Sequence, residues 1–236
     1  MPRSGGGMET KMDIKKICSH VDHTILKADT SLKDIDKLCE EAIRLKTASV
    51  CIPPHYIRYV HDKYSKELVI CTVVGFPLGM TTSSNKLAEC IEAIENGASE
   101  IDMVINVGEL KASNYDYVSK EIYTLAKACH ERSAILKVII ETALLSEDEI
   151  IKVSEICCEN DADFIKTSTG FSTRGANIHD IEIIKETIMR SGKKLKIKAS
   201  GGIRDLDFAL ALIDAGADRI GASSSVKIIE EYKSRQ

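Results

Sequence analysis

The sequence lacks the features of membrane and nucleic-acid-binding proteins. It has no tryptophan and only four prolines in 236 residues. It contains no uninterrupted apolar run of the roughly 20 residues that a membrane-spanning helix requires. Its 32 basic residues are interleaved with 36 acidic ones, giving a formal net charge of -4 and no basic tract. We therefore expect neither a membrane nor a nucleic acid as a partner.

The spacing of cysteine and histidine also argues against metal sites and disulfides. None of the eight cysteines forms a C-x-x-C pair, and none of the six histidines forms an H-x-x-x-H pair. The opening "MPRSGGG" has no apolar core of a signal peptide. We expect reduced thiols, a cytoplasmic protein and no metal or cofactor. Residues 1–12 are expected to be a disordered leader or an expression remnant, and residues 13–236 one domain.

Short β-rich runs alternate with longer segments of helical periodicity. The segments 31–45 and 146–159 are examples of the helical pattern, and each opens with a serine that can cap a helix. Eight such units in a chain of this length favour an α/β fold, a single-domain (β/α)8 TIM barrel, over an open doubly wound sheet. The expected strands are 20–25, 48–52, 69–74, 100–105, 135–141, 163–168, 195–200 and 218–222.

Three charged residues are expected to face the barrel axis. In "EIDMVIN" and "LKIKAS" the apolar side chains alternate with polar ones, so Asp102 and Lys198 point inward if the apolar side chains face the helices. The same parity directs Lys166 of "DFIKTS" inward. Two neighbouring ammonium groups repel each other, and burial also disfavours the charged form, so a neutral amine nucleophile is expected. The alternative is structural ion pairing, for instance Lys137–Glu141 or Lys198–Asp102.

Small residues follow the last two strands. The segments "SGGIRD" (200–205) and "GASSS" (221–225) expose backbone N–H groups where helices begin, which suits an anion. We expect a phosphate site there, although glycine also serves in ordinary turns. The predicted phosphate-binding residues are Gly201, Gly202, Gly221, Ala222, Ser223 and Ser224.

Further residues at strand ends are weaker candidates. Thr24, Cys51, Ser168 and Thr169 are expected to line the substrate site, with a structural role as the alternative for each. Asp22 and His23 precede Thr24 and are expected to line the mouth with it, with a hydrogen-bonded structural role as the alternative.

Several long stretches of the chain resemble deoxyribose-phosphate aldolases. The resemblance covers roughly residues 14–230 in order, and "EIDMVIN" with "FIKTSTGF" is its most specific part. It implies a class I aldolase on a TIM barrel, which reversibly cleaves 2-deoxy-D-ribose 5-phosphate to D-glyceraldehyde 3-phosphate and acetaldehyde in deoxyribonucleoside catabolism. Lys166 then matches the Schiff-base lysine, Lys198 the second lysine that favours loss of its proton, and Asp102 the acid of the proton relay. The resemblance also implies a phosphosugar as the small-molecule partner and a homo-oligomer, expected to be a dimer.

Two positions depart from the family pattern, and other functions stay open. Pro53 stands where asparagine is frequent, and Arg174 stands where glycine is usual, which could alter the loop after strand 6 or its anion contacts. The alternatives are a Schiff-base aldolase for a different phosphosugar, a phosphate-binding barrel isomerase, and a non-catalytic sugar-phosphate-binding barrel.

Overall fold

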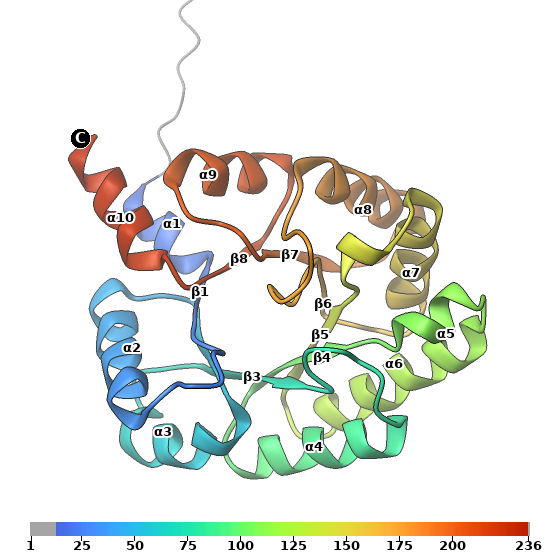
Figure 1. The fold of residues 1–236 in the computed structure, drawn as a ribbon, viewed down its shortest axis with the longest axis horizontal. Helices are drawn as coiled ribbons and strands as arrows, with labels where there is room; N and C mark the ends of the chain where they lie inside the picture. Colours follow the sequence, from blue (N-terminus) through green and yellow to red (C-terminus); the bar gives the residue numbers. More distant parts are fainter. Residues whose placement is uncertain (1–12, 236) are drawn as a thin grey trace, which may run out of the picture.

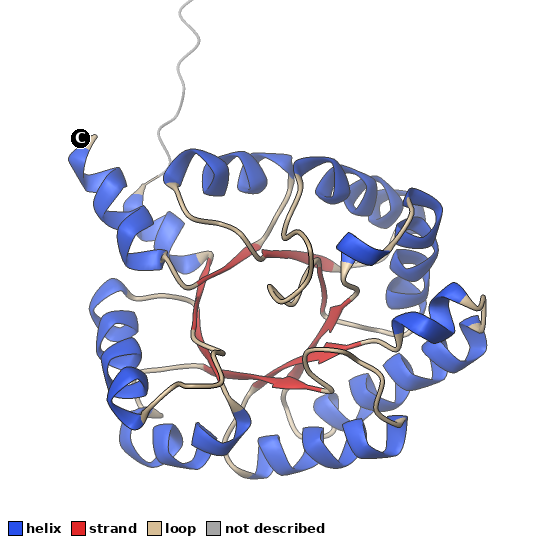
Figure 2. Ribbon diagram, viewed as in Figure 1, coloured by secondary structure: helices blue, strands red, loops and turns tan. Residues whose placement is uncertain are grey.

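A closed parallel barrel forms the centre of the molecule. The computed structural model describes residues 13–235. Within them, eight strands pair in chain order and β1 also pairs with β8, so the predicted (β/α)8 TIM barrel is confirmed (Figure 2). The leader expected at residues 1–12 lies outside the described residues. The strands are β1 (Val21–Thr24), β2 (Ser49–Ile52), β3 (Ile70–Val74), β4 (Glu100–Val104), β5 (Ile135–Ile139), β6 (Phe164–Lys166), β7 (Lys196–Ser200) and β8 (Arg219–Ala222).

Helices surround the barrel as an outer layer (Figure 1). They are α1 (Ile14–Ser19), α2 (Leu32–Leu45), α3 (Ile57–Tyr64), α4 (Ser83–Glu95), α5 (Val107–Lys111), α6 (Tyr115–His130), α7 (Glu147–Glu159), α8 (Ile178–Ser191), α9 (Leu206–Ala215) and α10 (Ser225–Ser234), with 3₁₀ helices η1 (Pro54–Tyr56) and η2 (Thr142–Leu144). The loop after β6 curls over the barrel mouth in Figure 1. In the described part of the chain, no helix combines the length and the apolar character needed to cross a bilayer.

The helix starts follow from local sequence chemistry. Ser31 and Ser146 each accept a hydrogen bond from the backbone of the third helical residue, and the acidic side chain at that position returns to the cap, so α2 and α7 both begin with a capping box. Asn177 caps α8 by accepting from the N–H of His179. Because these caps fix where the helices begin, they also fix the lengths of the loops at the barrel mouth.

The apolar core lies between the strands and the helices rather than on the barrel axis. Alternate strand residues such as Ile101, Met103 and Ile197 are buried there against the helices. The other strand face carries a small separate cluster of Cys51, Cys71 and Val73, and charged side chains fill much of the remaining interior. The barrel interior is therefore a polar compartment within an apolar shell.

One buried ion pair lies outside the barrel. Lys86 of α4 donates to Glu121 of α6 at 2.9 Å, and both side chains are fully buried. Glu121 also accepts from the Ser83 hydroxyl at 2.9 Å and from the Asn106 backbone N–H at 3.3 Å. Burial lowers the pKa of Lys86, while Glu121 opposes this shift. The pair links α4 and α6 to the segment that follows β4.

Candidate functional site

A cavity of about 370 Å³ opens at the carboxyl ends of the strands. Lys166, the last residue of β6, lies in its wall, and the loops after β1, β6, β7 and β8 supply the rest. All six residues predicted to bind phosphate line it: Gly201, Gly202, Gly221, Ala222, Ser223 and Ser224. The cavity therefore brings the predicted nucleophile and the predicted anion loops together.

Lys166 shares one carboxylate oxygen with a second lysine. Asp102 Oδ2 lies 2.8 Å from Lys166 Nζ and 2.7 Å from Lys198 Nζ. Lys166 and Lys198 are register partners on β6 and β7. Asp102 and Lys198 are fully buried, while Lys166 is 3% exposed and reaches the cavity. The three residues that strand parity directed inward do meet on the barrel axis.

Four further charged side chains extend this cluster. Lys137 Nζ contacts Glu100 at 2.6 Å, Asp102 at 2.9 Å and Asp22 at 3.9 Å. Lys198 Nζ contacts Asp22 at 2.6 Å. Arg219 joins Asp22 to Glu100, the latter at 3.1 Å. Together with Lys166 these residues form a connected set, here called the interior charge cluster.

The charged forms of the cluster stabilise one another. Burial alone would raise the pKa of Asp102, but Lys137, Lys166 and Lys198 outweigh it and hold the pKa well below its usual range. Burial alone would lower the pKa of Lys198, but Asp102 and Asp22 outweigh it and raise the pKa. Lys198 is therefore a permanent cation beside Lys166 at neutral pH.

The cluster holds one more basic than acidic group. Its bases are Lys137, Lys166, Lys198 and Arg219, and its acids are Asp22, Glu100 and Asp102. Removal of one proton therefore makes this buried set neutral, which low-dielectric surroundings favour. Among the described residues, Lys166 contacts one carboxylate, whereas each of the other three bases contacts at least two. Lys166 therefore has the fewest carboxylate contacts of the four bases.

The predicted phosphate loops combine left-handed glycines with an uncapped helix start. Gly201 and Gly202 have φ values of 84° and 74°, which favour glycine. A Cβ on Gly201 would lie 2.9 Å from the Cα of Gly175, so the loops after β6 and β7 pack backbone against backbone. α10 begins after Ser224, and no side chain caps it, which leaves backbone donors at the cavity.

The expected lining residues divide into two groups. Thr24 and Thr169 line the cavity. Cys51 and Ser168 are fully buried and are not among the lining residues: Cys51 belongs to the apolar cluster against which Leu26 packs, and the Ser168 hydroxyl donates to Thr167 Oγ1 at 3.1 Å.

Two expectations need correction. His23 faces outward and contacts Glu41 of α2 at 3.0 Å, so it does not lie at the mouth. Glu141 does not pair with Lys137, because β5 ends at Ile139 and Glu141 bonds to Thr169 instead. Arg174 belongs to the loop after β6, where it contacts Asp180 at 2.5 Å and the carbonyl of Thr142 at 2.9 Å, and it is not among the residues that line the cavity.

Sequence reasoning overlooked several residues of this region. Lys27, Arg204 and Phe171 line the cavity, and Arg219 belongs to the interior charge cluster. Arg219 could have been found from strand parity, since it alternates with the inward-facing Gly221. The loop residues carry no periodic signal that would have placed them.

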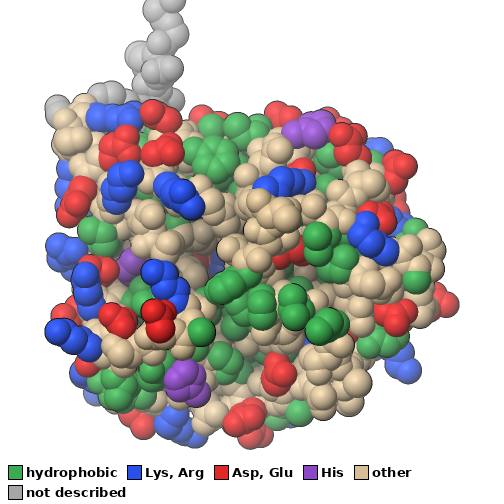
Figure 3. Space-filling model, viewed as in Figure 1, with side chains coloured by type: hydrophobic (Ala, Val, Ile, Leu, Met, Phe, Trp, Pro, Cys, Tyr) green, Lys and Arg blue, Asp and Glu red, His purple; other side chains and the backbone are tan. Residues whose placement is uncertain are grey.

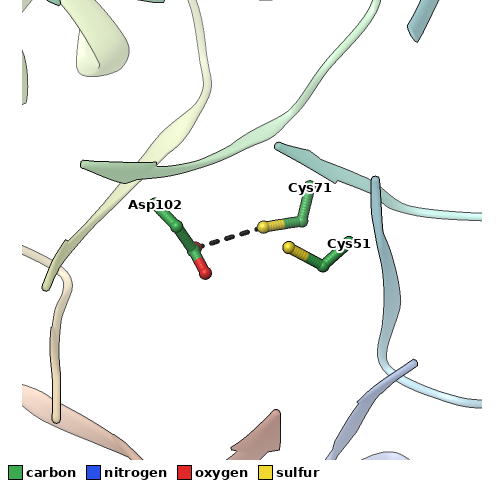
Figure 4. A group of neighbouring side chains, drawn as sticks. All are labelled: Cys51, Cys71 and Asp102. Carbon is green, nitrogen blue, oxygen red and sulfur yellow. Dashed lines mark hydrogen bonds between the residues drawn. The ribbon is translucent and has the colours of Figure 1, made fainter. Parts of the chain in front are cut away.

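Two thiols lie next to Asp102 and could share a metal ion with it. Cys51 Sγ, Cys71 Sγ and an Asp102 oxygen lie within 4.8 Å of one another (Figure 4). The Cys71 thiol is 3.1 Å from Asp102 Oδ1, and Lys137 Nζ is 3.2 Å from Cys71 Sγ. A cation there would compete with three ammonium groups for one carboxylate, so the electrostatics disfavour metal binding.

Apolar side chains border the mouth of the barrel. Hydrophobic atoms gather in a band across the face shown in Figure 3. Leu78, Met80, Leu144 and Phe171, in the loops after β3, β5 and β6, are all exposed. Phe171 meets Phe76 edge to face, with ring centroids 5.4 Å apart. A small apolar rim thus surrounds a polar interior.

Comparisons with known proteins agree with this geometry. Deoxyribose-phosphate aldolase of Mycoplasmoides pirum is 53% identical over 211 residues, which is 89% of this chain and 94% of the relative. The enzyme of the same name from Clostridioides difficile strain 630 is 48% identical over 92% of this chain and 97% of its own length. A solved structure described as "QR15, an Aldolase" superposes with a TM-score of 0.87 at 41% identity, covering 95% of this chain and 97% of that one.

A more distant solved relative and a family model complete the comparison. Deoxyribose phosphate aldolase from Aeropyrum pernix, described as a unique tetrameric structure, superposes with a TM-score of 0.88 at 29% identity, covering 95% of this chain and 94% of that one. The model described as DeoC/LacD family aldolase matches residues 16–229. This match spans all eight strands and the residues of the cavity and the interior charge cluster. The chain therefore belongs to the DeoC/LacD family of aldolases.

Proposed function

We propose that this chain is a class I deoxyribose-phosphate aldolase, which reversibly cleaves 2-deoxy-D-ribose 5-phosphate to D-glyceraldehyde 3-phosphate and acetaldehyde. One observation carries the proposal. The Lys166 amine reaches a cavity lined by glycine- and serine-rich loops, and it shares a carboxylate oxygen with a second, buried lysine. The names of the two curated relatives above supply the substrate.

The reaction begins with the amine of Lys166. The neutral amine attacks the aldehyde carbon of the open-chain sugar, and loss of water gives a protonated imine. The imine at C1 accepts the electron pair of the C2–C3 bond, which breaks when a base takes the proton of the C3 hydroxyl. D-Glyceraldehyde 3-phosphate leaves, and the remaining enamine takes up a proton and is hydrolysed to acetaldehyde and free Lys166. The imine itself is the electron sink, so the mechanism calls for no metal or cofactor.

Asp102 and Lys198 are assigned the proton transfers and the charge balance. Asp102 accepts and returns protons at the substrate hydroxyl and the enamine carbon through a water and Lys198. The contacts of Asp102 Oδ2 with both amines support this role. Lys198 is charged before the attack, and its repulsion favours the neutral amine of Lys166.

The cavity loops are assigned the phosphate group. Backbone N–H groups of Gly201, Gly202 and Ser223 bind the phosphate oxygens, with Gly221, Ala222 and Ser224 completing the wall. Binding at this end holds the aldehyde end against Lys166, which lowers the entropic cost of the attack. Thr24 and Thr169 are expected to contact the sugar from the cavity wall.

The location and assembly of the chain are also proposals. We infer a cytoplasmic protein, because all eight cysteines are free thiols. We propose a homodimer, which light scattering of the purified chain tests. A monomer or a tetramer would contradict this assignment.

The substrate is tested by direct assay. The purified chain is expected to release acetaldehyde from 2-deoxy-D-ribose 5-phosphate, and Lys166→Arg is expected to release none. Arginine keeps the positive charge that Asp102 contacts but cannot form the imine, so it separates covalent catalysis from charge balance. Cleavage of a different phosphosugar but not of this one would establish the alternative aldolase, and cleavage by Lys166→Arg would refute the Schiff-base mechanism.

A further inference from the structure

Glu141 occupies an unusual position just beyond the end of β5. Its backbone adopts the left-handed conformation, with φ 53° and ψ 66°, which is uncommon for a residue other than glycine. Its side chain is buried at 4% exposure, although no basic side chain among the described residues pairs with it. A buried carboxylate with no counter-ion on a strained backbone indicates a specific requirement at this position.

The carboxylate is bonded to the turn that follows Lys166. Glu141 Oε2 accepts from the Thr169 N–H at 3.2 Å and, through a short hydrogen bond, from the Thr169 hydroxyl. The Thr169 Oγ1 atom in turn accepts from the Phe171 N–H at 3.1 Å. Glu141 Oε1 has no hydrogen-bond partner within residues 13–235. The bond to Glu141 therefore fixes which way the Thr169 hydroxyl donates.

A hydroxyl whose proton is already donated can only accept further hydrogen bonds. Threonine has one donor and two acceptor lone pairs. Glu141 takes the donor and Phe171 uses one lone pair, so one lone pair of Thr169 is left at the cavity wall.

Thr169 lies between the nucleophile and the phosphate loops. It comes three residues after Lys166, and a Cβ on the adjacent Gly170 would lie 3.9 Å from the Cα of Gly201. If a sugar phosphate spans from Lys166 to the loop after β7, its phosphate-proximal hydroxyl is expected to lie along this wall. That hydroxyl is a donor, and the free lone pair of Thr169 is an acceptor.

We propose that Glu141 is a positioning residue that makes Thr169 an obligate acceptor for the hydroxyl next to the phosphate-bearing carbon of the substrate. The inference rests on the proposed aldolase function. It adds a reason why the enzyme would select acceptor aldehydes that carry this hydroxyl group. Formation of the imine should not depend on Glu141, because Glu141 bonds to Thr169 and not to Lys166 or Asp102.

The test uses the condensation direction, in which acetaldehyde is joined to a phosphorylated acceptor. Two acceptors are compared: D-glyceraldehyde 3-phosphate, and 3-oxopropyl phosphate, which lacks the hydroxyl. The wild-type chain is expected to prefer the hydroxylated acceptor in kcat/KM by about tenfold or more. Glu141→Ala is expected to reduce this preference to within about threefold, because its Thr169 hydroxyl can rotate. Glu141→Gln retains an acceptor oxygen for Thr169 and is expected to keep most of the preference.

Controls separate positioning from folding and from the proposed function. Glu147→Ala removes an exposed glutamate at the start of α7 that contacts His179, and its acceptor preference should match that of the wild type. Trapping of acetaldehyde on Lys166 with borohydride should be equal in Glu141→Ala and the wild type, since acetaldehyde has no hydroxyl. Unchanged acceptor preference in Glu141→Ala would overturn the inference, as would an equal loss with both acceptors. Failure of the wild-type chain to trap acetaldehyde would instead refute the proposed function, and the inference with it.

Discussion

Replacement of Lys198 by methionine should slow imine formation at Lys166 while leaving the nucleophile in place. The substitution removes a buried cation that contacts both Asp102 and Asp22. The interior charge cluster then contains three bases and three acids, so it is neutral with Lys166 protonated. Lys166 would then remain an ammonium group paired with Asp102, and an ammonium group cannot attack an aldehyde.

The size of the effect follows from the geometry of the shared oxygen. Lys198 Nζ and Lys166 Nζ lie 2.7 Å and 2.8 Å from Asp102 Oδ2, so the two nitrogens are no more than 5.5 Å apart. At an effective dielectric constant of about 20, two unit charges at this separation repel by about 3 kcal/mol. Loss of this repulsion corresponds to a decrease of roughly a hundredfold in the neutral amine at a given pH.

The assay is the rate of borohydride trapping of acetaldehyde, followed by intact mass at several pH values. We expect Lys198→Met to be roughly a hundredfold slower near pH 7 and to recover as the pH rises. Lys196→Met is the matched control, since Lys196 lies on the same strand but is exposed. Circular dichroism must first show that each variant is folded. A folded Lys198→Met with the wild-type rate at neutral pH, or a slow variant that high pH does not rescue, would refute the reasoning.

Three further predictions concern stability and phosphate binding. Glu121→Gln leaves the buried lysine of α4 without a counter-ion and should lower the free energy of unfolding by about 3–5 kcal/mol in urea titrations; a loss below about 1 kcal/mol would contradict a charged pair. Gly201→Ala places a Cβ 2.9 Å from the Cα of Gly175 at φ 84°, so KM for the phosphosugar should rise while acetaldehyde trapping is retained, and a parallel loss of both would argue against a phosphate role. The folded state depresses the pKa of Asp102 and Asp22, so the unfolded chain binds more protons. The contribution of these two carboxylates to the free energy of unfolding should be complete above their unfolded-state pKa of about 3.9. Below that pH it should decline, by up to about 1.4 kcal/mol per pH unit for each carboxylate. Unfolding free energies that stay constant from pH 5 to about pH 2 would disprove this.

Strand periodicity predicted the barrel and the centre of its site. Alternation along a strand has a fixed period of two, so the inward direction of Asp102 and Lys198 followed once the apolar residues were assigned to the helix side. Lys166 followed in the same way, and Asp102 contacts both lysines. The glycine-rich loops could also be located, because α/β barrels bring the carboxyl ends of the strands to one face.

The features of the site that could not be predicted from the sequence depend on where a strand ends and on which residues pack over its end. Glu141 has the parity of Lys137, but β5 ends before it and a left-handed backbone turns its side chain toward the loop after β6. Nothing in the residue type signals that conformation. Cys51 does face inward, yet it is fully buried in a small apolar cluster and does not line the cavity. Whether an inward-facing side chain reaches the cavity depends on loop packing, which has no period along the chain.

The most direct test of the account is to identify the lysine that forms the imine. The purified chain is incubated with acetaldehyde, reduced with borohydride, digested and mapped by mass spectrometry. We expect one ethyl group on Lys166, in the peptide that contains "DFIKTSTGFS", and unmodified Lys198. A folded chain with no adduct, or an adduct on Lys198 in place of Lys166, would contradict it.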